Sequence, residues 1–290
     1  MNKIEIPVAE KLSLPGGRHL DLTRPLVMGV INVTPDSFSD GGRYHDLNDA
    51  VARAEQMIND SADIIDIGGE SSRPGSVSIH IDEELRRTIP VIKAVRRISS
   101  IPISIDSTKS EAARQAIDAG ADIINDISAL RFDNKMAEVA AGFDGPVVLM
   151  HMLGTPKTMQ ADPHYDDCIR EIREFFEERL TFCGQHGIER TRIILDPGIG
   201  FGKRLEDNIN IIKNFRQFSS FGCPLLMGAS RKSFIAMITG IRGNADKRIG
   251  GSLAALIHAI HAGCNILRVH DVAETVEAIK VMSAIEDFQQ

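Results

Sequence analysis

Short apolar runs alternate with amphipathic stretches along nearly the whole chain. The runs are rich in Ile, Leu and Val and are bounded by turn residues, which is typical of buried strands. Eight strands are therefore predicted, at residues 26–33, 63–67, 102–105, 122–125, 146–150, 192–195, 224–227 and 265–269. The stretches between them show the helical period and predict helices at about 48–60, 82–98, 110–119, 134–141, 165–186, 205–217, 246–262 and 272–287.

This alternation is typical of an α/β fold. Eight strand–helix units in 290 residues favour a (β/α)8 TIM barrel, and a doubly wound open sheet is the structural alternative. Before the first strand, residues 4–21 form two short alternating runs around Leu14-Pro-Gly-Gly-Arg18, which predicts an N-terminal β-hairpin that covers the bottom of the barrel. We expect residues 1–290 to form a single domain, with 1–24 as the hairpin extension.

Composition and charge exclude several classes of function. The net charge of −7, a pI near 5.7 and the absence of Trp argue against nucleic acid or an anionic membrane as a partner. The four cysteines form no CxxC pair and read as reduced structural thiols. The first residues contain no apolar signal region, and no stretch is long enough to span a bilayer, so a cytoplasmic location is expected.

Each predicted strand is followed by polar residues. Asn32 lies inside an apolar strand, where an unpaired amide would cost roughly 1–3 kcal/mol; the plainer interpretation is a loop-capping Asn. Similar polar segments follow the other strands, at 68–75, 106–109, 125–126, 150–152, 196–203, 228–233 and 268–271. Because the carboxyl ends of barrel strands meet on one rim, the repetition predicts an active site there.

Two carboxylates and an amide, Asp106, Asn125 and Asp196, close apolar strands and should point into the mouth of the barrel. Carboxylates accept paired N–H groups, so the trio suits a planar heterocycle with amidine-like donors. Ile127, Met150 and Phe201 offer apolar walls for such a ring. The alternative is that Asp106 and Asp196 hold a divalent cation.

A local basic cluster predicts an anion site in this acidic chain. Ser230-Arg-Lys-Ser233 lies where the seventh strand passes into a helix, and Arg73, Arg268 and His270 add charge from other loops. Solvated surface side chains are the plainer interpretation of most Lys and Arg, but Arg268 interrupts an apolar strand. Phe38 is the sole aromatic in the loop 37–42 and is a candidate to cover a flat substrate.

These motifs, taken in order, resemble the bacterial dihydropteroate synthases over essentially the whole chain. They are Asn32-Val-Thr-Pro-Asp-Ser-Phe-Ser-Asp-Gly-Gly42, Gly68-Gly-Glu-Ser-Ser-Arg-Pro-Gly75, Ile105-Asp-Ser107, Asn125-Asp-Ile127, Met150-His-Met152, Asp196-Pro-Gly-Ile-Gly-Phe-Gly-Lys203, Ser230-Arg-Lys-Ser233 and Arg268-Val-His270. The resemblance implies a (β/α)8 transferase of folate biosynthesis. It would condense 6-hydroxymethyl-7,8-dihydropterin diphosphate with 4-aminobenzoate, using Mg2+, and release 7,8-dihydropteroate and diphosphate.

The resemblance also implies a role for each matching residue. The expected sets are Asp106, Asn125, Asp196 and Lys232 on the pterin, with Met150, Phe201 and Gly228 lining its slot; Asn32 on Mg2+ and diphosphate; Ser72, Arg73, Arg268 and His270 on diphosphate; and Phe38, Pro74 and Ser233 around 4-aminobenzoate. Asp106, Lys232, Arg268 and His270 would be the catalytic residues. A homodimer through the last helices and competitive inhibition by sulfonamides are implied as well.

The chain departs from the family pattern at Ser72, where Thr is usual: the hydroxyl is kept and a methyl group is lost near the expected 4-aminobenzoate site, which bears on sulfonamide affinity. Three other functions compete with the synthase. A pterin-binding methyltransferase would share the pterin pocket but would not need Ser230–Ser233 or the Asn32 loop. A non-catalytic pterin-binding protein would leave the anion groups idle, and a phosphate-binding barrel of sugar metabolism would need a Lys/Glu pair that the sequence does not reveal.

Overall fold

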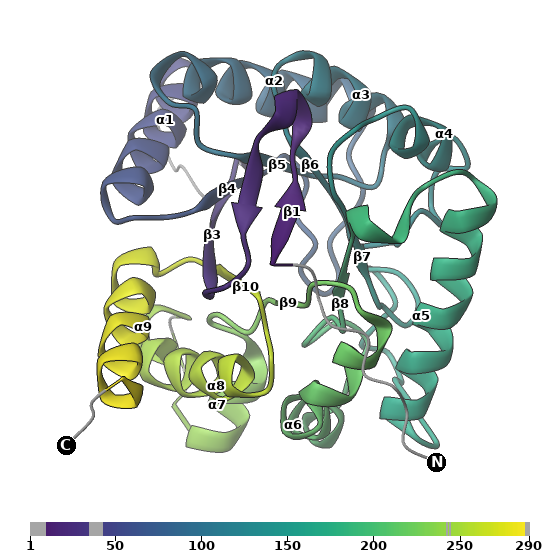
Figure 1. The fold of residues 1–290 in the computed structure, drawn as a ribbon, viewed down its shortest axis with the longest axis vertical. Coiled ribbons are helices and arrows are strands. Elements are labelled where there is room, and N and C mark those ends of the chain that lie inside the picture. Colours follow the sequence, from purple (N-terminus) through teal and green to yellow (C-terminus); the bar gives the residue numbers. More distant parts are fainter. Residues whose placement is uncertain (1–9, 35–42, 242, 244, 288–290) are drawn as a thin grey trace.

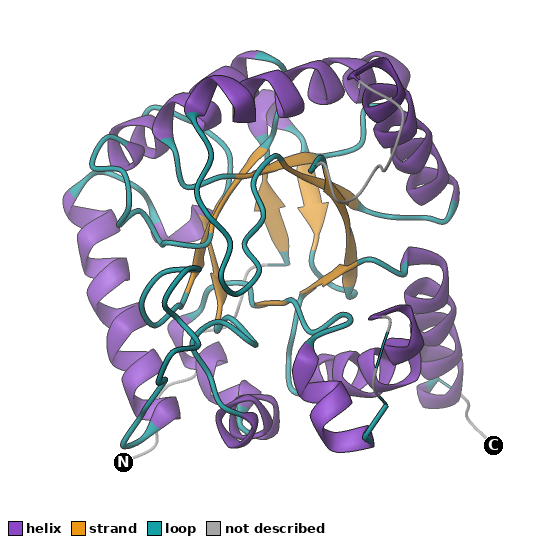
Figure 2. Ribbon diagram, turned by 180° about the vertical axis from the view of Figure 1, so that it is seen from behind, coloured by secondary structure: helices purple, strands orange, loops and turns teal. Residues whose placement is uncertain are grey.

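The computed structural model describes residues 10–34, 43–241, 243 and 245–287. Eight parallel strands form the inner layer: β3 (Leu26–Asn32), β4 (Ile64–Gly68), β5 (Ile103–Asp106), β6 (Ile123–Asp126), β7 (Val147–Met150), β8 (Ile193–Asp196), β9 (Leu226–Met227) and β10 (Ile266–Val269). Helices surround them: α1 (Arg43–Asn59), α2 (Ile81–Ile98), α3 (Ser110–Asp118), α4 (Met136–Ala141), α5 (Cys168–Gln185), α6 (Leu205–Lys213), α7 (Ser233–Thr239), α8 (Ile249–His261) and α9 (Val272–Glu286). Figure 2 shows the ring of strands inside the helices.

The sheet closes into a barrel. Its neighbours follow the order β8-β7-β6-β5-β4-β3-β10-β9, and every pair is parallel. A bridge between Leu195 and Leu225 joins the β8 edge to the segment that leads into β9. A doubly wound sheet would leave its two edges apart, so the (β/α)8 prediction is confirmed and the open-sheet alternative is excluded.

Alternation along the strands divides the core into two layers. Val27, Ile31 and Ile65 point outward and pack in the cluster that includes the inner faces of the helices. Met28, Ile64 and other residues near the strand starts belong to a second cluster inside the barrel. Successive side chains of a strand alternate between faces, so the inward positions beyond these apolar residues are free to carry chemistry.

The predicted N-terminal hairpin is confirmed. Strands β1 (Lys11–Ser13) and β2 (His19–Asp21) are antiparallel and are joined through a 3-10 turn at Pro15–Gly17. Its four leucines pack with the first inward residue of several barrel strands: Leu12, Leu14, Leu20 and Leu22 meet Met28, Ile64, Ile123, Val148, Ile194, Leu226 and Ile266. The hairpin therefore covers the amino-terminal end of the barrel, where Figure 1 shows it lying across the strands.

Several helix boundaries differ from the predicted ranges. α5 begins at Cys168, and not at 165, because the Asp167 carboxylate accepts the Arg170 N–H and caps it. The range 205–217 is split between α6 and a 3-10 helix at Phe215–Phe221, and the range 246–262 opens as a 3-10 turn at Ala245–Arg248. α7 lies outside all eight predicted ranges and ends at Gly240, which has φ +68°. Within the described residues, no helix has the length and apolarity required to cross a membrane.

Candidate active site

The carboxyl ends of the strands bring the predicted polar residues to the same end of the barrel. The register places Asn32 opposite Gly68, Gly68 opposite Asp106, and Asp106 opposite Asn125. Met150 lies opposite Asp196 farther around the ring. Side chains that are up to 164 residues apart in sequence thus face the same mouth, as the rim argument predicts.

An ion-pair network occupies the floor of this mouth. The Arg268 guanidinium lies between two carboxylates: its Nη2 is 2.6 Å from Asp106 Oδ2 and 2.6 Å from Asp66 Oδ2. Asn125 Nδ2 donates to both oxygens of Asp66 at 3.3 Å, which leaves its carbonyl oxygen as an acceptor. Asp66 is fully buried. Asp106 is therefore tied, through Arg268, to a second carboxylate that the sequence analysis did not single out.

Burial shifts the pKa of most charged groups around the floor. Burial raises the pKa of Asp106 to about 7, against the opposing charge of Arg268. Burial raises the pKa of Asp196 to about 6, although its Oδ1 accepts the Gly198 N–H at 2.7 Å. Burial lowers the pKa of Lys232 to about 8, and burial together with the Arg268 charge lowers that of His270 to about 4. Shifts of this size cluster at functional sites.

An apolar wall stands beside the carboxylates. Ile127, Met150 and Phe201 form one buried cluster with Met152 and Met159. Lys232 Nζ lies 4.1 Å from the centre of the Phe201 ring. Apolar walls with carboxylates at the edge suit a flat, hydrogen-bonding ring, which is the kind of ligand that the sequence predicts here.

A cavity of about 600 Å3 opens above the floor. It brings together most of the remaining predicted residues: Asn32, Ser72, Arg73, Pro74, Phe201, Gly228, Lys232, Ser233, Arg268 and His270 all line it. A second hollow, of about 500 Å3, shares Asn32, Arg73 and His270 with it. Phe38 lies outside the described residues.

Two basic residues of the rim are held by neighbouring groups. The Arg231 guanidinium forms ion pairs with Asp246 and with Asp271, the latter at 2.5 Å. His270 Nδ1 lies 3.3 Å from Ser230 Oγ, and its backbone N–H donates to the same oxygen. Arg231, a member of the predicted basic cluster, is therefore held by carboxylates at the cavity wall.

Two partly buried ion pairs anchor the loop that carries Ser72 and Arg73. Glu70 Oε2 accepts Ser78 Oγ–H and the Ile79 N–H, which closes the loop on itself. Lys109 Nζ bridges Glu70 and Glu84, at 2.6 Å from Glu84 Oε2. The loop after β4 is therefore fixed to α2 and to the segment after β5.

The residues present fit a magnesium ion held mainly by substrate. Asn32 supplies an amide oxygen on the cavity wall beside Arg73 and His270, and Mg2+ is bound in proteins by few oxygen ligands together with phosphate and water. Asp106 is engaged by Arg268, so it is poorly placed for the alternative cation site with Asp196. Among the described residues, no group of three or more His, Cys, Asp or Glu could hold a metal by itself.

Asp66 carries the same signal that drew attention to Asn32 and Arg268. It is a charged residue in the middle of an apolar run, Ile64-Ile65-Asp66-Ile67. A charge is buried in a strand only where it is paired, and its partner comes from β10, 202 residues away. The sequence could have revealed the anomaly but not the partner.

The fold, the flat slot and the adjoining anion cavity define a pterin-binding enzyme on a (β/α)8 barrel, and the family model described as "Pterin binding enzyme" matches residues 28–270. Dihydropteroate synthase of Escherichia coli (strain K12) is 47% identical over 268 residues, covering 92% of this chain and 94% of that protein. The chain belongs to the dihydropteroate synthase family.

Solved structures agree with this assignment. Xanthomonas albilineans dihydropteroate synthase with 4-aminobenzoic acid aligns with a TM-score of 0.91 at 42% identity, over 97% of this chain and 100% of that one. The Yersinia pestis enzyme in a sulfonamide drug complex aligns with a TM-score of 0.88 at 40% identity, over 96% and 100%. The resemblance stated from the motifs is thereby confirmed, and so is the class of enzyme, a transferase.

Proposed function

We propose that the described site performs the condensation in two adjoining compartments. The pterin of 6-hydroxymethyl-7,8-dihydropterin diphosphate occupies the slot, its diphosphate occupies the cavity, and 4-aminobenzoate enters from the rim. The observation that carries this proposal is that Phe201, which belongs to the apolar wall, and Lys232, whose Nζ lies over the Phe201 ring, both line the cavity as well.

On the pterin side, Asp106, Asn125 and Asp196 bind the ring edge, and Met150 and Phe201 hold its faces. As the C–O bond to diphosphate breaks, positive charge develops on the pterin, and the ionised form of Asp106 stabilises it. Arg268 keeps Asp106 in place and balances its charge. The aniline nitrogen then attacks the carbon, and the N-protonated product, which is a strong acid, releases its proton to water, so the site needs no strong general base.

On the anion side, Asn32, Ser72, Arg73 and His270 surround the diphosphate, and Lys232 lies at the junction. Mg2+ would supply charge neutralisation to the leaving diphosphate, with Asn32 as its protein ligand. Arg268 was expected to hold the diphosphate. Its pairing with Asp66 and Asp106 supports a place nearer the pterin.

The 4-aminobenzoate site is proposed at Pro74, Ser233 and Phe38. Sulfonamides, which carry an aniline and an acidic group, would compete there. Ser72 retains the hydroxyl of the usual Thr and lacks its methyl group, so this chain has one methyl group fewer in the wall of the cavity. Replacing Ser72 with Thr and measuring both the 4-aminobenzoate KM and the sulfonamide inhibition constant tests whether the methyl matters.

The decisive experiment is diphosphate release with Mg2+, the pterin diphosphate and 4-aminobenzoate, each omitted in turn. We expect release only in the complete mixture, coupled one to one to dihydropteroate and blocked by a sulfonamide. Chelation of Mg2+ should abolish it. Pterin binding without release would overturn the proposed reaction and favour the methyltransferase or the non-catalytic binding protein.

We further propose a homodimer through the last helices of the chain, α7 to α9. Four of their apolar side chains are more than half exposed: Met237, Ile238, Val281 and Ile285. Sedimentation of the protein and of an Ile285→Asp variant tests this, and a monomeric native protein at micromolar concentration would refute it.

A cytoplasmic location is proposed from the four cysteines, which are buried and free. Recovery of the native protein outside the cytoplasm after cell fractionation would contradict it.

A further inference from the structure

Lys203 is a buried amine that the mechanism above does not use. Its residue is 3% exposed, and among the described residues no carboxylate forms an ion pair with it. Burial lowers its pKa to about 7. Lysine is rarely buried unless it is paired, because removing the charge from water is costly. A lysine buried in this position therefore needs hydrogen-bond partners that compensate for the lost water.

The compensation comes from three acceptors. Lys203 Nζ donates to the Phe201 carbonyl at 3.0 Å, to His151 Nδ1 at 3.0 Å and to the His151 carbonyl at 3.4 Å. Burial holds the pKa of His151 well below 6.5, so its imidazole is neutral and Nδ1 can accept. The ring also packs edge-on against Phe175, with centroids 4.8 Å apart.

These acceptors belong to two different strand ends. His151 directly follows Met150 at the end of β7, and Phe201 lies in the segment that follows Asp196 at the end of β8. The His151 N–H also donates to the Asp196 carbonyl at 2.9 Å. Met150, Asp196 and Phe201 are the wall and edge of the proposed pterin slot. One ammonium group therefore joins the two segments that make one side of the slot.

The segment itself is built for close approach to its support. Gly198, Gly200 and Gly202 all have positive φ, at +70°, +80° and +62°. A Cβ at Gly198 would lie 2.0 Å from the His151 carbonyl oxygen, so no side chain fits between the two segments. Such tight packing leaves the carbonyls of His151 and Phe201 in a dry interior, where an unpaired acceptor is expensive.

We propose that Lys203 is a positioning residue for the pterin slot: its ammonium group ties the segment after β7 to the segment after β8 and so sets the distance between the slot wall and Asp196. This inference rests on the proposed pterin site. It assigns no contact between Lys203 and substrate, and it predicts an effect on pterin recognition that 4-aminobenzoate recognition does not share.

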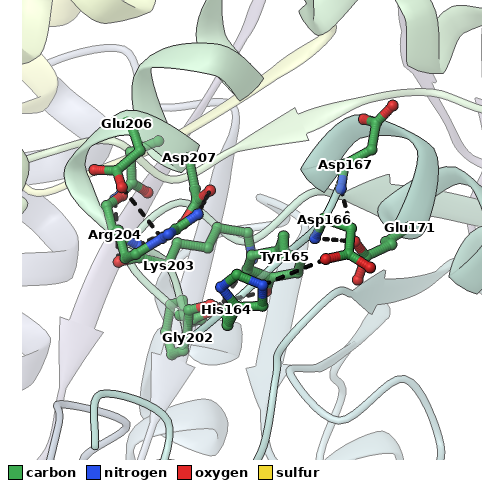
Figure 3. Close-up of polar contacts among 12 residues, drawn as sticks. His164, Tyr165, Asp166, Asp167, Glu171, Gly202, Lys203, Arg204, Glu206 and Asp207 are labelled. Atoms are coloured by element: carbon green, nitrogen blue, oxygen red, sulfur yellow. Dashed lines mark hydrogen bonds and ion pairs between the residues drawn. The ribbon is translucent and has the colours of Figure 1, made fainter. Parts of the chain in front are cut away.

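The same segment offers a matched control. Tyr165, also buried, donates its hydroxyl to the Gly202 carbonyl at 2.8 Å. Figure 3 shows Tyr165 and Gly202 on one side of Lys203 and the Arg204–Asp207 pair on the other. Tyr165→Phe removes one buried hydrogen bond from this segment at a residue that lines neither the slot nor the cavity.

The experiment compares steady-state kinetics of the native enzyme with Lys203→Met, His151→Phe and Tyr165→Phe. Met keeps the length and apolar stem of Lys203 but donates no hydrogen bond. Phe keeps the aromatic contact of His151 but removes its acceptor. We expect Lys203→Met and His151→Phe to raise the pterin diphosphate KM by about tenfold, because small displacements of a binding wall are costly. The 4-aminobenzoate KM should stay within about twofold, and Tyr165→Phe should change neither KM by more than that.

A parallel rise of both KM values, or an equal effect of Tyr165→Phe, would reduce Lys203 to a general structural residue and overturn the proposal. An unchanged pterin KM in folded Lys203→Met would do the same. If Lys203→Met does not fold, the pterin KM of His151→Phe decides the test by the same criteria. A Phe201→Ala variant separates this inference from the assignment of the pterin slot. If Phe201→Ala leaves the pterin KM unchanged, the slot is wrongly assigned. If Phe201→Ala raises the pterin KM and Lys203→Met does not, only the role of Lys203 is refuted.

Discussion

The two ends of the barrel use the same strands for opposite purposes. At the amino-terminal end, the inward residues are apolar and meet the four leucines of the hairpin. At the carboxyl end, one or two alternations farther along, the inward residues are Asp66, Asp106, Asn125, Asp196 and Arg268. The first end is closed by side chains, and the second opens into the cavity.

This difference shows that residues for stability and residues for chemistry occupy different positions along the same strand. They are not divided between different strands. A strand such as β4 contributes Ile64 to the closed end and Asp66 to the open one, two residues apart. Substitutions at the closed end should therefore change unfolding, and substitutions at the open end should change catalysis. The variants below test where that division holds and where it fails.

Arg268 should be an exception to this division, because it lies at the open end and yet supports both stability and catalysis. Replacing it with Met leaves Asp66 and Asp106 buried without a counter-charge, which typically costs about 3–5 kcal/mol of unfolding free energy. Activity should be lost as well. Urea unfolding measures the effect, and Arg114→Met, which removes an exposed pair with Glu111, serves as the control with little change. A native unfolding midpoint for Arg268→Met would show that the network does not support the fold.

Leu12→Ala should affect stability alone. Leu12 is 1% exposed and packs at the closed end, so removing its side chain should cost about 2–5 kcal/mol. At a temperature where the variant is still folded, kcat/KM for both substrates should stay within about twofold of native. A fall in kcat/KM without a fall in stability would mean that the hairpin communicates with the site.

Asp106→Asn should lower the turnover and leave the stability of the fold unchanged, the reverse of Leu12→Ala. The amide cannot stabilise positive charge on the pterin, so turnover should fall by more than about tenfold. The fold should persist, because Arg268 keeps its bonds to Asp66. Initial rates and a thermal unfolding scan on the same sample check both statements. Near-normal turnover would refute the charge-stabilising role.

Much of this division could be predicted from the sequence. The closed end and the strands follow from apolar periodicity, and Leu14-Pro-Gly-Gly-Arg18 marks the hairpin turn. Asp106, Asn125 and Asp196 stand out because each ends an apolar run. Their grouping on one floor follows from the barrel, in which all strand ends meet.

Other parts depend on partners that only the three-dimensional structure supplies. Asp66 is paired with Arg268 across 202 residues of sequence, and no local pattern specifies that pair. Lys203 stands in a recognised motif, but its role follows from the positions of the His151 and Phe201 carbonyls. α7 is not predicted from the sequence, because a seven-residue helix ended by Gly240 is too short to show a helical period of apolar residues.

The smallest expected effect separates two glycines, Gly228 directly after β9 and Gly29 on β3. Within the part of the chain that the structure describes, and apart from its chain neighbours, a Cβ at Gly228 would have only the Arg268 Cβ within 4 Å, at 3.9 Å. The protein therefore accommodates an Ala there, and the unfolding free energy should change by less than about 0.5 kcal/mol. The added methyl group lies in the wall of the cavity, at its proposed junction with the pterin slot. The pterin KM should therefore rise severalfold, while the native stability is kept.

Gly29 provides the opposite case on β3. A Cβ there would lie 2.7 Å from Met57 Sδ and 3.0 Å from Val272 Cγ2, on the face that packs against the helices. Gly29→Ala should thus destabilise by about 1–3 kcal/mol through overpacking, with both KM values unchanged in the folded fraction. Unfolding and KM should be measured for both variants. If the division between packing and chemistry holds, Gly228→Ala changes only the pterin KM and Gly29→Ala changes only the stability. If Gly228→Ala leaves the pterin KM unchanged, the cavity wall beside Arg268 does not contact the substrate.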